Sequence, residues 1–145
     1  MIDFSWMTGG KQGSGIDSAL GTFGKILMKK GYRIFGYREY FSNIKGMHSF
    51  FMLRFSDKQV KSISNQVDMA VFYDSESVFG LKNERGEVVH DGHIKDIKPN
   101  GVLIIDKSID KSKIARNDIN IVSIDFSQIA SKTAKESGAP LSEVE

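Results

Sequence analysis

Four glycines in seven residues near the amino end constrain the fold of this chain more than any other stretch. Gly9-Gly10-Lys11-Gln12-Gly13-Ser14-Gly15 follows a short alternating apolar run, which predicts a strand over residues 2–7. Apolar side chains then recur at spacings of three and four over residues 16–27, and Gly31 stands where a helix is expected to end. The pattern therefore predicts a strand, a tight turn and a helix in that order.

The glycine loop is expected at the carboxyl end of a strand and the amino end of a helix, where unpaired N–H groups favour an anion such as phosphate. Its spacing, however, matches neither the dinucleotide pattern G-x-G-x-x-G nor the phosphate-loop pattern G-x-x-x-x-G-K-[ST]. Lys11 precedes the helix and cannot act as a phosphate-loop lysine. Two interpretations stay open, a phosphate-binding loop and a turn that binds nothing, and the loop alone favours the turn.

The remaining apolar runs predict an α/β domain. A strand directly after the first helix would make a β-α-β unit, with two parallel neighbours and a right-handed crossover. We predict a three-layer, Rossmann-like domain with a mostly parallel sheet, and we place Asp74 at the same edge as the glycine loop. After the first strand, the strands are expected over 32–37, 49–55, 69–73, 102–106 and 119–124, with a short hairpin strand near 87–90 and a final helix that ends by Gly138.

Composition narrows the class of protein. The 145 residues, 40% hydrophobic and 26% charged, predict a single domain over 1–145. A net charge of +2 predicts neither nucleic-acid nor membrane partners, and no run is long enough for a membrane span or arranged like a signal peptide, so we expect a cytoplasmic protein. The chain has no cysteine, so it can hold no disulfide, thiolate zinc site or thiolate-ligated iron–sulfur cluster.

The segment Arg38–Ser49 is unusually polar for a connection between two strands. Its twelve positions include two basic residues, a carboxylate, an amide, an imidazole and a phenol. Together with the glycine loop, it resembles the gamma domain of the 2-oxoacid:ferredoxin oxidoreductases that act on pyruvate or 2-oxoglutarate, in the form fused to the alpha subunit of archaeal-type enzymes. The motifs that carry the resemblance are Gly9-Gly10-x-Gln12-Gly13-x-Gly15-x-Asp17, then Arg38-Glu39-Tyr40, Ser42-Asn43-Ile44-Lys45-Gly46 and His48-Ser49.

The resemblance covers most of the chain and weakens beyond about Asp74. It implies a complex that oxidatively decarboxylates a 2-oxoacid to acyl-CoA and reduces ferredoxin, with thiamine diphosphate and iron–sulfur clusters on the partner alpha and beta subunits. The gamma domain would supply an assembly surface and part of the coenzyme A site, and the isolated chain would be inactive. Because a further helical segment follows in the family, the chain is expected to be a fragment lacking its closing helix, or one split component.

The resemblance implies cofactor-binding roles for residues of the two motifs and no catalytic residue. The positions assigned to the coenzyme A site are Gly13, Ser14, Gly15, Arg38, Glu39, Tyr40, Asn43, Lys45, Gly46 and His48. The cations would meet the phosphates of the cofactor. By themselves, adjacent opposite charges such as Arg38 and Glu39 are also typical of an ion pair with each other or of a contact with a helix end.

Two other functions remain open, an independent Rossmann-type nucleotide-binding enzyme and a purely structural assembly domain. The segment 40–49 separates the nucleotide enzyme from the gamma domain, because a nucleotide enzyme would not need it, whereas a domain that meets partner subunits and coenzyme A would. His48 is more typical of a surface or hydrogen-bonded residue than of a catalyst, and His90 and His93 form no H-E-x-x-H pattern, so we predict no metal site and regard Asp91 between them as a chance neighbour.

Overall fold

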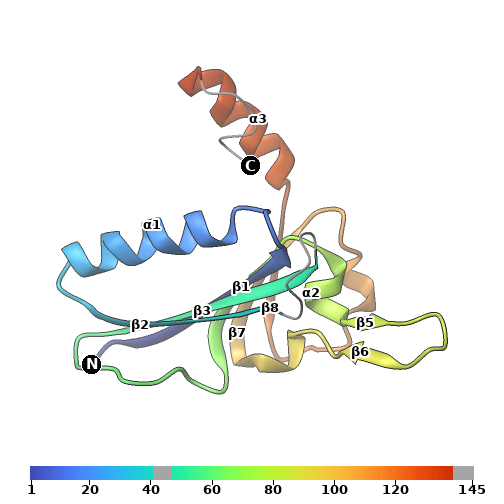
Figure 1. Ribbon diagram of the computed structural model, residues 1–145, viewed down its shortest axis with the longest axis horizontal. Helices are drawn as coiled ribbons and strands as arrows, with labels where there is room; N and C mark the ends of the chain where they lie inside the picture. Colours follow the sequence, from blue (N-terminus) through green and yellow to red (C-terminus); the bar gives the residue numbers. More distant parts are fainter. Residues whose placement is uncertain (41–46, 139–145) are drawn as a thin grey trace.

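The computed structural model describes residues 1–40 and 47–138, which form a six-stranded sheet with helices on both faces (Figure 1). The strand order is β2-β3-β1-β4-β7-β8. The elements along the chain are β1 (Asp3–Lys11), α1 (Ile16–Lys29), β2 (Arg33–Tyr40), β3 (His48–Ser56), β4 (Val67–Phe72), α2 (Ser75–Phe79), β5 (Leu81–Lys82), β6 (Val88–His90), the 3-10 turn η1 (Ile94–Asp96), β7 (Ile97–Asp106), η2 (Lys111–Lys113), β8 (Asn120–Ile124) and α3 (Phe126–Ser137).

The sheet is mostly parallel, as predicted. β1, β4, β7 and β8 are paired in parallel with one another, whereas β3 pairs antiparallel with both β1 and β2. The expectation that the first two strands are parallel neighbours is therefore wrong, because β3 lies between them. The apolar residues of β3 are buried on both faces, with Phe50 and Met52 on one side and Leu53 on the other, which favours an inner position over the more exposed β2.

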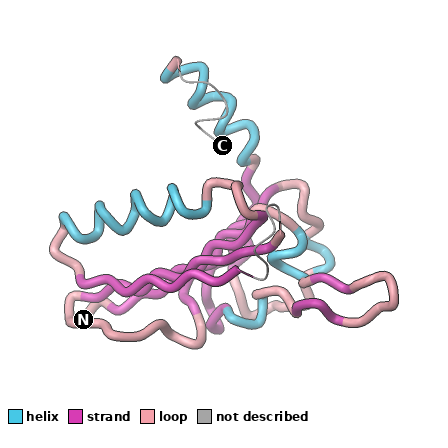
Figure 2. Tube along the Cα trace, in the orientation of Figure 1, coloured by secondary structure: helices cyan, strands magenta, loops and turns pink. Residues whose placement is uncertain are grey.

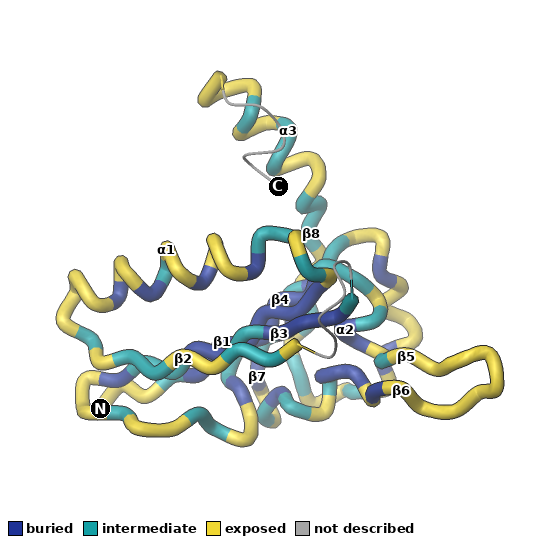
Figure 3. Tube along the Cα trace, viewed as in Figure 1, coloured by how far each residue is buried: buried dark blue, intermediate teal, exposed yellow. Residues whose placement is uncertain are grey.

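Alternation along the strands separates two cores. On one face of the sheet, Trp6, Leu53 and Val71 point toward α1. There they pack in one cluster with Ile16 and Leu20 of that helix. The opposite face carries the larger core, which includes Met7, Phe72, Val78, Ile97, Leu103 and Ile105 and is covered by α2 and the connections around η1 and η2. Figure 3 shows this buried centre along β1, β3 and β4. The three-layer arrangement follows from these two apolar faces.

Two elements extend from the body of the molecule. α3 projects beyond the carboxyl end of β8, and none of its residues is buried. The β5–β6 hairpin projects from the side that carries α2, and its residues are exposed up to His90 (Figures 2 and 3). The predicted final helix and hairpin strand are thus both present.

Several predicted boundaries change in ways that matter for the site. β1 continues to Lys11, so Gly9 and Gly10 belong to the strand and the turn into α1 is made by residues 12–15. A side chain at Gly9 would meet Phe72 and Ser77 at 3.1 Å, which explains a glycine inside a strand. β2 continues to Tyr40, so Arg38, Glu39 and Tyr40 lie on a strand and not on the predicted connecting loop.

Candidate functional site

The glycine loop connects β1 to α1 as predicted and leaves the amino end of the helix open. Gly13 and Gly15 adopt φ angles of 95° and 80°, a left-handed conformation that favours glycine. Gly15 is the N-cap of α1 and provides no side-chain cap, while the Ser14 hydroxyl donates to Lys11 O at 2.7 Å. First-turn N–H groups without a side-chain acceptor are suited to bind an anion.

A groove of about 690 Å³ opens beside this loop, at the carboxyl edge of the parallel strands. Its floor is formed by residues that follow β4 and β7, and α3 forms the far wall. The lining residues are Gly13, Ser14, Tyr73, Asp106, Ser108, Phe126, Ser127, Ile129, Ala130 and Thr133. Hydroxyl groups and an apolar helix face therefore share one groove, which is typical of sites for small molecules with both polar and apolar parts.

Asp106 links the floor of the groove to the wall. Burial alone would raise its pKa, but hydrogen bonds from the Ser108 hydroxyl, the Ser108 N–H and the Phe126 N–H hold the pKa of Asp106 below its usual range. Phe126 also meets Tyr73 edge to face, with ring centroids 5.1 Å apart. The start of α3 is thus tied to the carboxyl ends of β4 and β7.

Arg38 connects the second predicted motif to the first. Its guanidinium pairs with Asp17 in the first turn of α1 and lies over the Tyr40 ring, 3.9 Å from the centroid. Within residues 1–40 and 47–138, the buried Nε of Arg38 has no hydrogen-bond acceptor. The cation predicted to meet phosphate therefore lies at the amino end of the glycine-capped helix.

Glu39 makes a different contact from its neighbour. It accepts a hydrogen bond of 2.6 Å from the Tyr37 hydroxyl, and this bond to a carboxylate raises the pKa of Tyr37. The ion pair between Arg38 and Glu39 that adjacency suggests is thus replaced by Arg38–Asp17 and Tyr37–Glu39 contacts. Alternation along β2 explains the difference, because adjacent side chains point to opposite faces.

Three residues assigned to the site, Asn43, Lys45 and Gly46, lie outside the described residues. The described chain resumes at Met47, whose carbonyl accepts from Gln12 N–H at 2.9 Å. The second motif thus returns to the glycine loop at its carboxyl side as well as at Arg38.

His48 does not lie with Arg38 at the helix terminus. It is fully buried on the opposite face of the sheet, where its ring stacks on His90 at 4.6 Å and its Nε2 lies 2.9 Å from Nε2 of His93. Burial, and then the neighbouring His93 and His90, lower the pKa of His48 to about 4. Sequence spacing missed this cluster, because His90 and His93 reach His48 only through the pairing of β5 with β6 and the packing of α2.

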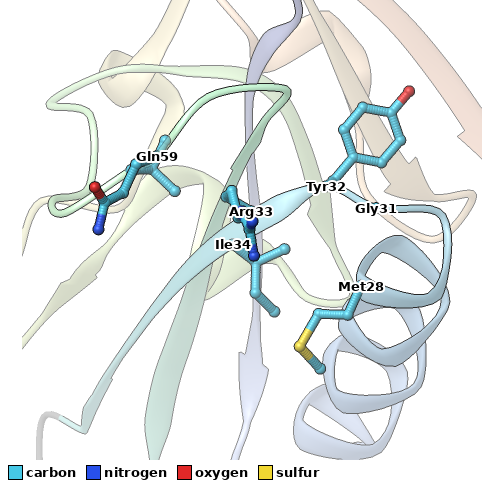
Figure 4. Close-up of a pocket in the computed structure, with 7 residues that line it drawn as sticks. Met28, Gly31, Tyr32, Arg33, Ile34 and Gln59 are labelled. Atoms are coloured by element: carbon cyan, nitrogen blue, oxygen red, sulfur yellow. The ribbon is translucent and has the colours of Figure 1, made fainter.

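A second hollow, of about 500 Å³, lies at the other end of α1. Met28, Gly31, Tyr32, Arg33, Ile34, Gln59 and Val60 line it, where the helix ends and β2 begins (Figure 4). Gln59, on the connection after β3, stands across from Arg33 and Ile34 (Figure 4). This hollow is remote from the carboxyl edge of the parallel strands, so the groove beside Gly13 is the better candidate site.

Comparison with known proteins identifies the family. Residues 5–141 match the model of the pyruvate ferredoxin/flavodoxin oxidoreductase family, which is nearly the whole chain. The chain belongs to this family. The resemblance inferred from the two motifs is therefore confirmed, and the family supports the gamma-domain interpretation over an independent nucleotide-binding enzyme.

The relatives are alpha subunits of larger enzymes. The alpha subunit of 2-oxoacid:ferredoxin oxidoreductase 1 from Sulfurisphaera tokodaii is 33% identical over 97% of this chain, which corresponds to 26% of that subunit. The chain therefore spans about a quarter of the length of this curated relative.

Solved structures with the same fold have lower identity. The 2-oxoglutarate:ferredoxin oxidoreductase from Magnetococcus marinus, solved with 2-oxoglutarate, coenzyme A and succinyl-CoA, superposes with a TM-score of 0.73, at 18% identity over 99% of this chain and 23% of that one. The gamma subunit of a keto/oxoacid ferredoxin oxidoreductase from Geobacter sulfurreducens gives 0.71, at 17% identity over 97% and 69%. The predicted α/β fold is confirmed. None of the described helices is long and apolar enough to cross a membrane.

Proposed function

We propose that this chain is the gamma-type domain of a 2-oxoacid:ferredoxin oxidoreductase, in which it supplies an assembly surface and part of the coenzyme A site. The family match over residues 5–141 supports the complex, and a gamma subunit of comparable fold supports the role of the domain. We place thiamine diphosphate and the iron–sulfur clusters on the partner alpha and beta subunits, because this chain has no cysteine and no recognisable thiamine diphosphate motif. Ferredoxin would be the electron acceptor of the complex.

The observation that carries the coenzyme A assignment is the meeting of Arg38 with the open amino end of α1. Coenzyme A combines a phosphorylated nucleotide with a long arm that has amide and apolar parts. The helix terminus at Gly15 and the nearby guanidinium favour the phosphates. The groove lined by Ser14, Ser108 and Ile129 offers hydroxyl and apolar surface for a neutral part of the ligand.

Asp17 sets the strength of this interaction. Its carboxylate already neutralises part of the Arg38 charge, and both side chains are partly exposed, 27% for Arg38 and 50% for Asp17. The contribution of Arg38 to phosphate binding is therefore smaller than that of a fully buried ion pair. We expect about a tenfold effect on affinity, equivalent to about 1.4 kcal/mol.

The test is Arg38→Ala in the complete oxidoreductase. The variant should raise the Michaelis constant for coenzyme A about tenfold, while the 2-oxoacid decarboxylation half-reaction stays within twofold of wild type. Arg33→Ala, an exposed arginine at the other end of the same strand, is the matched control and should change neither quantity. Lys45→Ala tests the second predicted cation in the same assay.

An unchanged response to coenzyme A in both Arg38→Ala and Lys45→Ala would leave assembly as the role of this surface. Loss of subunit association in the Arg38 variant, measured by analytical ultracentrifugation, would give the same result. Oxidative decarboxylation of a 2-oxoacid by the chain on its own, with an artificial electron acceptor, would contradict the assignment to a non-catalytic component.

A further inference from the structure

The opposite face of the sheet holds a buried cluster of metal-ligating side chains that the proposed coenzyme A site does not use. It brings together His48 at the start of β3, Glu76 in α2 and His90 in β6. One ligand atom from each of the three lies within 4.8 Å of the others. His48 is fully buried, the His90 side chain is 3% exposed and that of Glu76 is 20% exposed.

We propose that His48, Glu76 and His90 bind one divalent transition-metal ion of the zinc class. Two imidazoles and a carboxylate are a donor set that zinc accepts, with a fourth position left for water or another ligand. Bond lengths of about 2.0–2.2 Å place tetrahedral ligand atoms roughly 3.3–3.6 Å apart. The three ligand atoms therefore need to approach one another by no more than about 1.5 Å, and Glu76 Oε1 is already 3.0 Å from His90 Nε2.

A chain of hydrogen bonds orients His48 toward this position. Asp96 Oδ2 accepts a hydrogen bond of 2.9 Å from Nδ1–H of His93, which leaves Nε2 of His93 as a hydrogen-bond acceptor. Nε2–H of His48 then donates to it across 2.9 Å. Nδ1 of His48 is thereby turned toward α2, where it lies 3.4 Å from the Ser77 hydroxyl oxygen. That hydroxyl donates its own hydrogen to Asp74 at 2.7 Å. Metal-binding histidines are commonly held in this way by a second partner that ends at a carboxylate.

The charge of the cluster and its access from solvent also suit a metal ion. Glu76 provides a negative charge that offsets part of the charge of the ion. His93 and Asp96 lie at the edge of a surface hollow of about 280 Å³ that His90, Asp91 and Lys95 also line, which gives an ion a route from solvent.

Binding requires two local changes. The His48 and His90 rings, now stacked with an interplanar angle of 10°, must tilt so that their lone pairs converge. The proton of His90 moves from Nε2, where Glu76 now accepts it, to Nδ1, which gives up the 3.3 Å hydrogen bond from Gly92 N–H. An ion bound here would cross-link β3, α2 and the base of the β5–β6 hairpin, three segments that are distant in the sequence (Figure 1).

The experiment is titration of the purified, metal-free protein with Co²⁺ and then Zn²⁺. Wild type should bind one equivalent of Co²⁺ with the intense visible absorption of a four-coordinate ion, and Zn²⁺ should displace it. Zn²⁺ at 100 times its dissociation constant should raise the unfolding temperature, as mass action requires for an ion that binds only the folded state.

Glu76→Gln and His90→Gln should weaken Zn²⁺ affinity at least 100-fold, and Asp96→Asn should weaken it 10- to 100-fold through the orientation of His93 and His48. Asp91→Asn is the matched control, because this exposed carboxylate pairs with Lys95 and should leave affinity within twofold of wild type. Circular dichroism verifies folding, and Glu76→Gln, at a partly exposed position, keeps the test valid if His90→Gln unfolds.

Two results would overturn the proposal. One is that wild type binds no equivalent of Co²⁺ or Zn²⁺ at micromolar concentration. The other is that the folded Glu76→Gln variant retains wild-type affinity, which would place the ion elsewhere. Neither result bears on coenzyme A, because the Arg38 site lies on the other face of the sheet and has a separate assay.

Discussion

Acid should destabilise this protein through His48 before its carboxylates begin to titrate. In the unfolded chain a histidine titrates near 6.5, whereas burial and the neighbouring His93 and His90 lower the folded-state pKa of His48 to about 4. Between these values the unfolded state binds more protons than the folded state, so stability rises with pH. The contribution is complete above pH 6.5 and is lost as the pH falls toward 4.

The magnitude follows from the same two values. A pH of 5 lies about 1.5 units below the histidine pKa in the unfolded chain, so the unfolded state is protonated there while folded His48 is still mostly neutral. Each unit corresponds to 1.36 kcal/mol, so the free energy of unfolding should fall by about 2 kcal/mol between pH 7.5 and pH 5. For a chain of this size, that change lowers the urea midpoint by about 1 M. Asp74 acts in the opposite direction and limits the effect.

The assay is urea unfolding at both pH values in buffer with EDTA, for wild type and His48→Gln. Wild type should lose about 2 kcal/mol more than the variant over this interval. If His48→Gln does not fold, nuclear magnetic resonance of the wild-type histidine rings provides the measurement, with His48 neutral at pH 5. Equal losses in wild type and variant, or a His48 ring that titrates near 6.5, would show that burial does not lower the pKa of His48.

Two further predictions concern stability and use the same urea assay at pH 7.5. Gly92→Ala should lower the free energy of unfolding by about 3 kcal/mol or more, because the new Cβ would lie 2.4 Å from Gly80 N at a φ of +67°. Gly86→Ala, at a φ of +77° in open space, should lower it by only about 1–2 kcal/mol, and similar losses in the two variants would contradict the role of close packing at Gly92. Phe72→Ala, in the fully buried core, should lower the free energy of unfolding by about 3–5 kcal/mol, and a small loss would contradict the place of Phe72 in the core. Val89→Ala, on the exposed hairpin, should change the free energy of unfolding by no more than about 0.5 kcal/mol.

Local pattern was sufficient for most elements of the fold. The glycines, the helical stripe over residues 16–27 and the apolar runs predicted β1, α1, β3, β4, β7, β8 and α3, because periodicity and turn chemistry are properties of neighbouring residues. The order of strands was not available in this way. The position of β3 between β1 and β2 depends on which strand buries both of its faces, and that is a property of the whole sheet.

The candidate coenzyme A site was partly within reach of the sequence. The motifs indicated that Gly13–Gly15 and Arg38 act together, and the structure brings Arg38 to Asp17 at the helix that the glycines begin. The groove wall formed by Phe126 and Ile129 was not predicted, because these residues are more than 100 positions from the glycine loop. No local signal links such distant segments, and the parallel strands bring them to one edge.

The family, the α/β class and the turn that opens the helix terminus can all be inferred from the sequence, since these depend on motifs and on periodicity within short segments. The histidine cluster, in contrast, depends on the packing of the folded chain. His48, Glu76 and His90 belong to three elements, and each alone is an ordinary polar residue near the end of a strand or helix. They become neighbours because α2 and the β5–β6 hairpin pack over the face of the sheet opposite α1, and burial there lowers the pKa of His48.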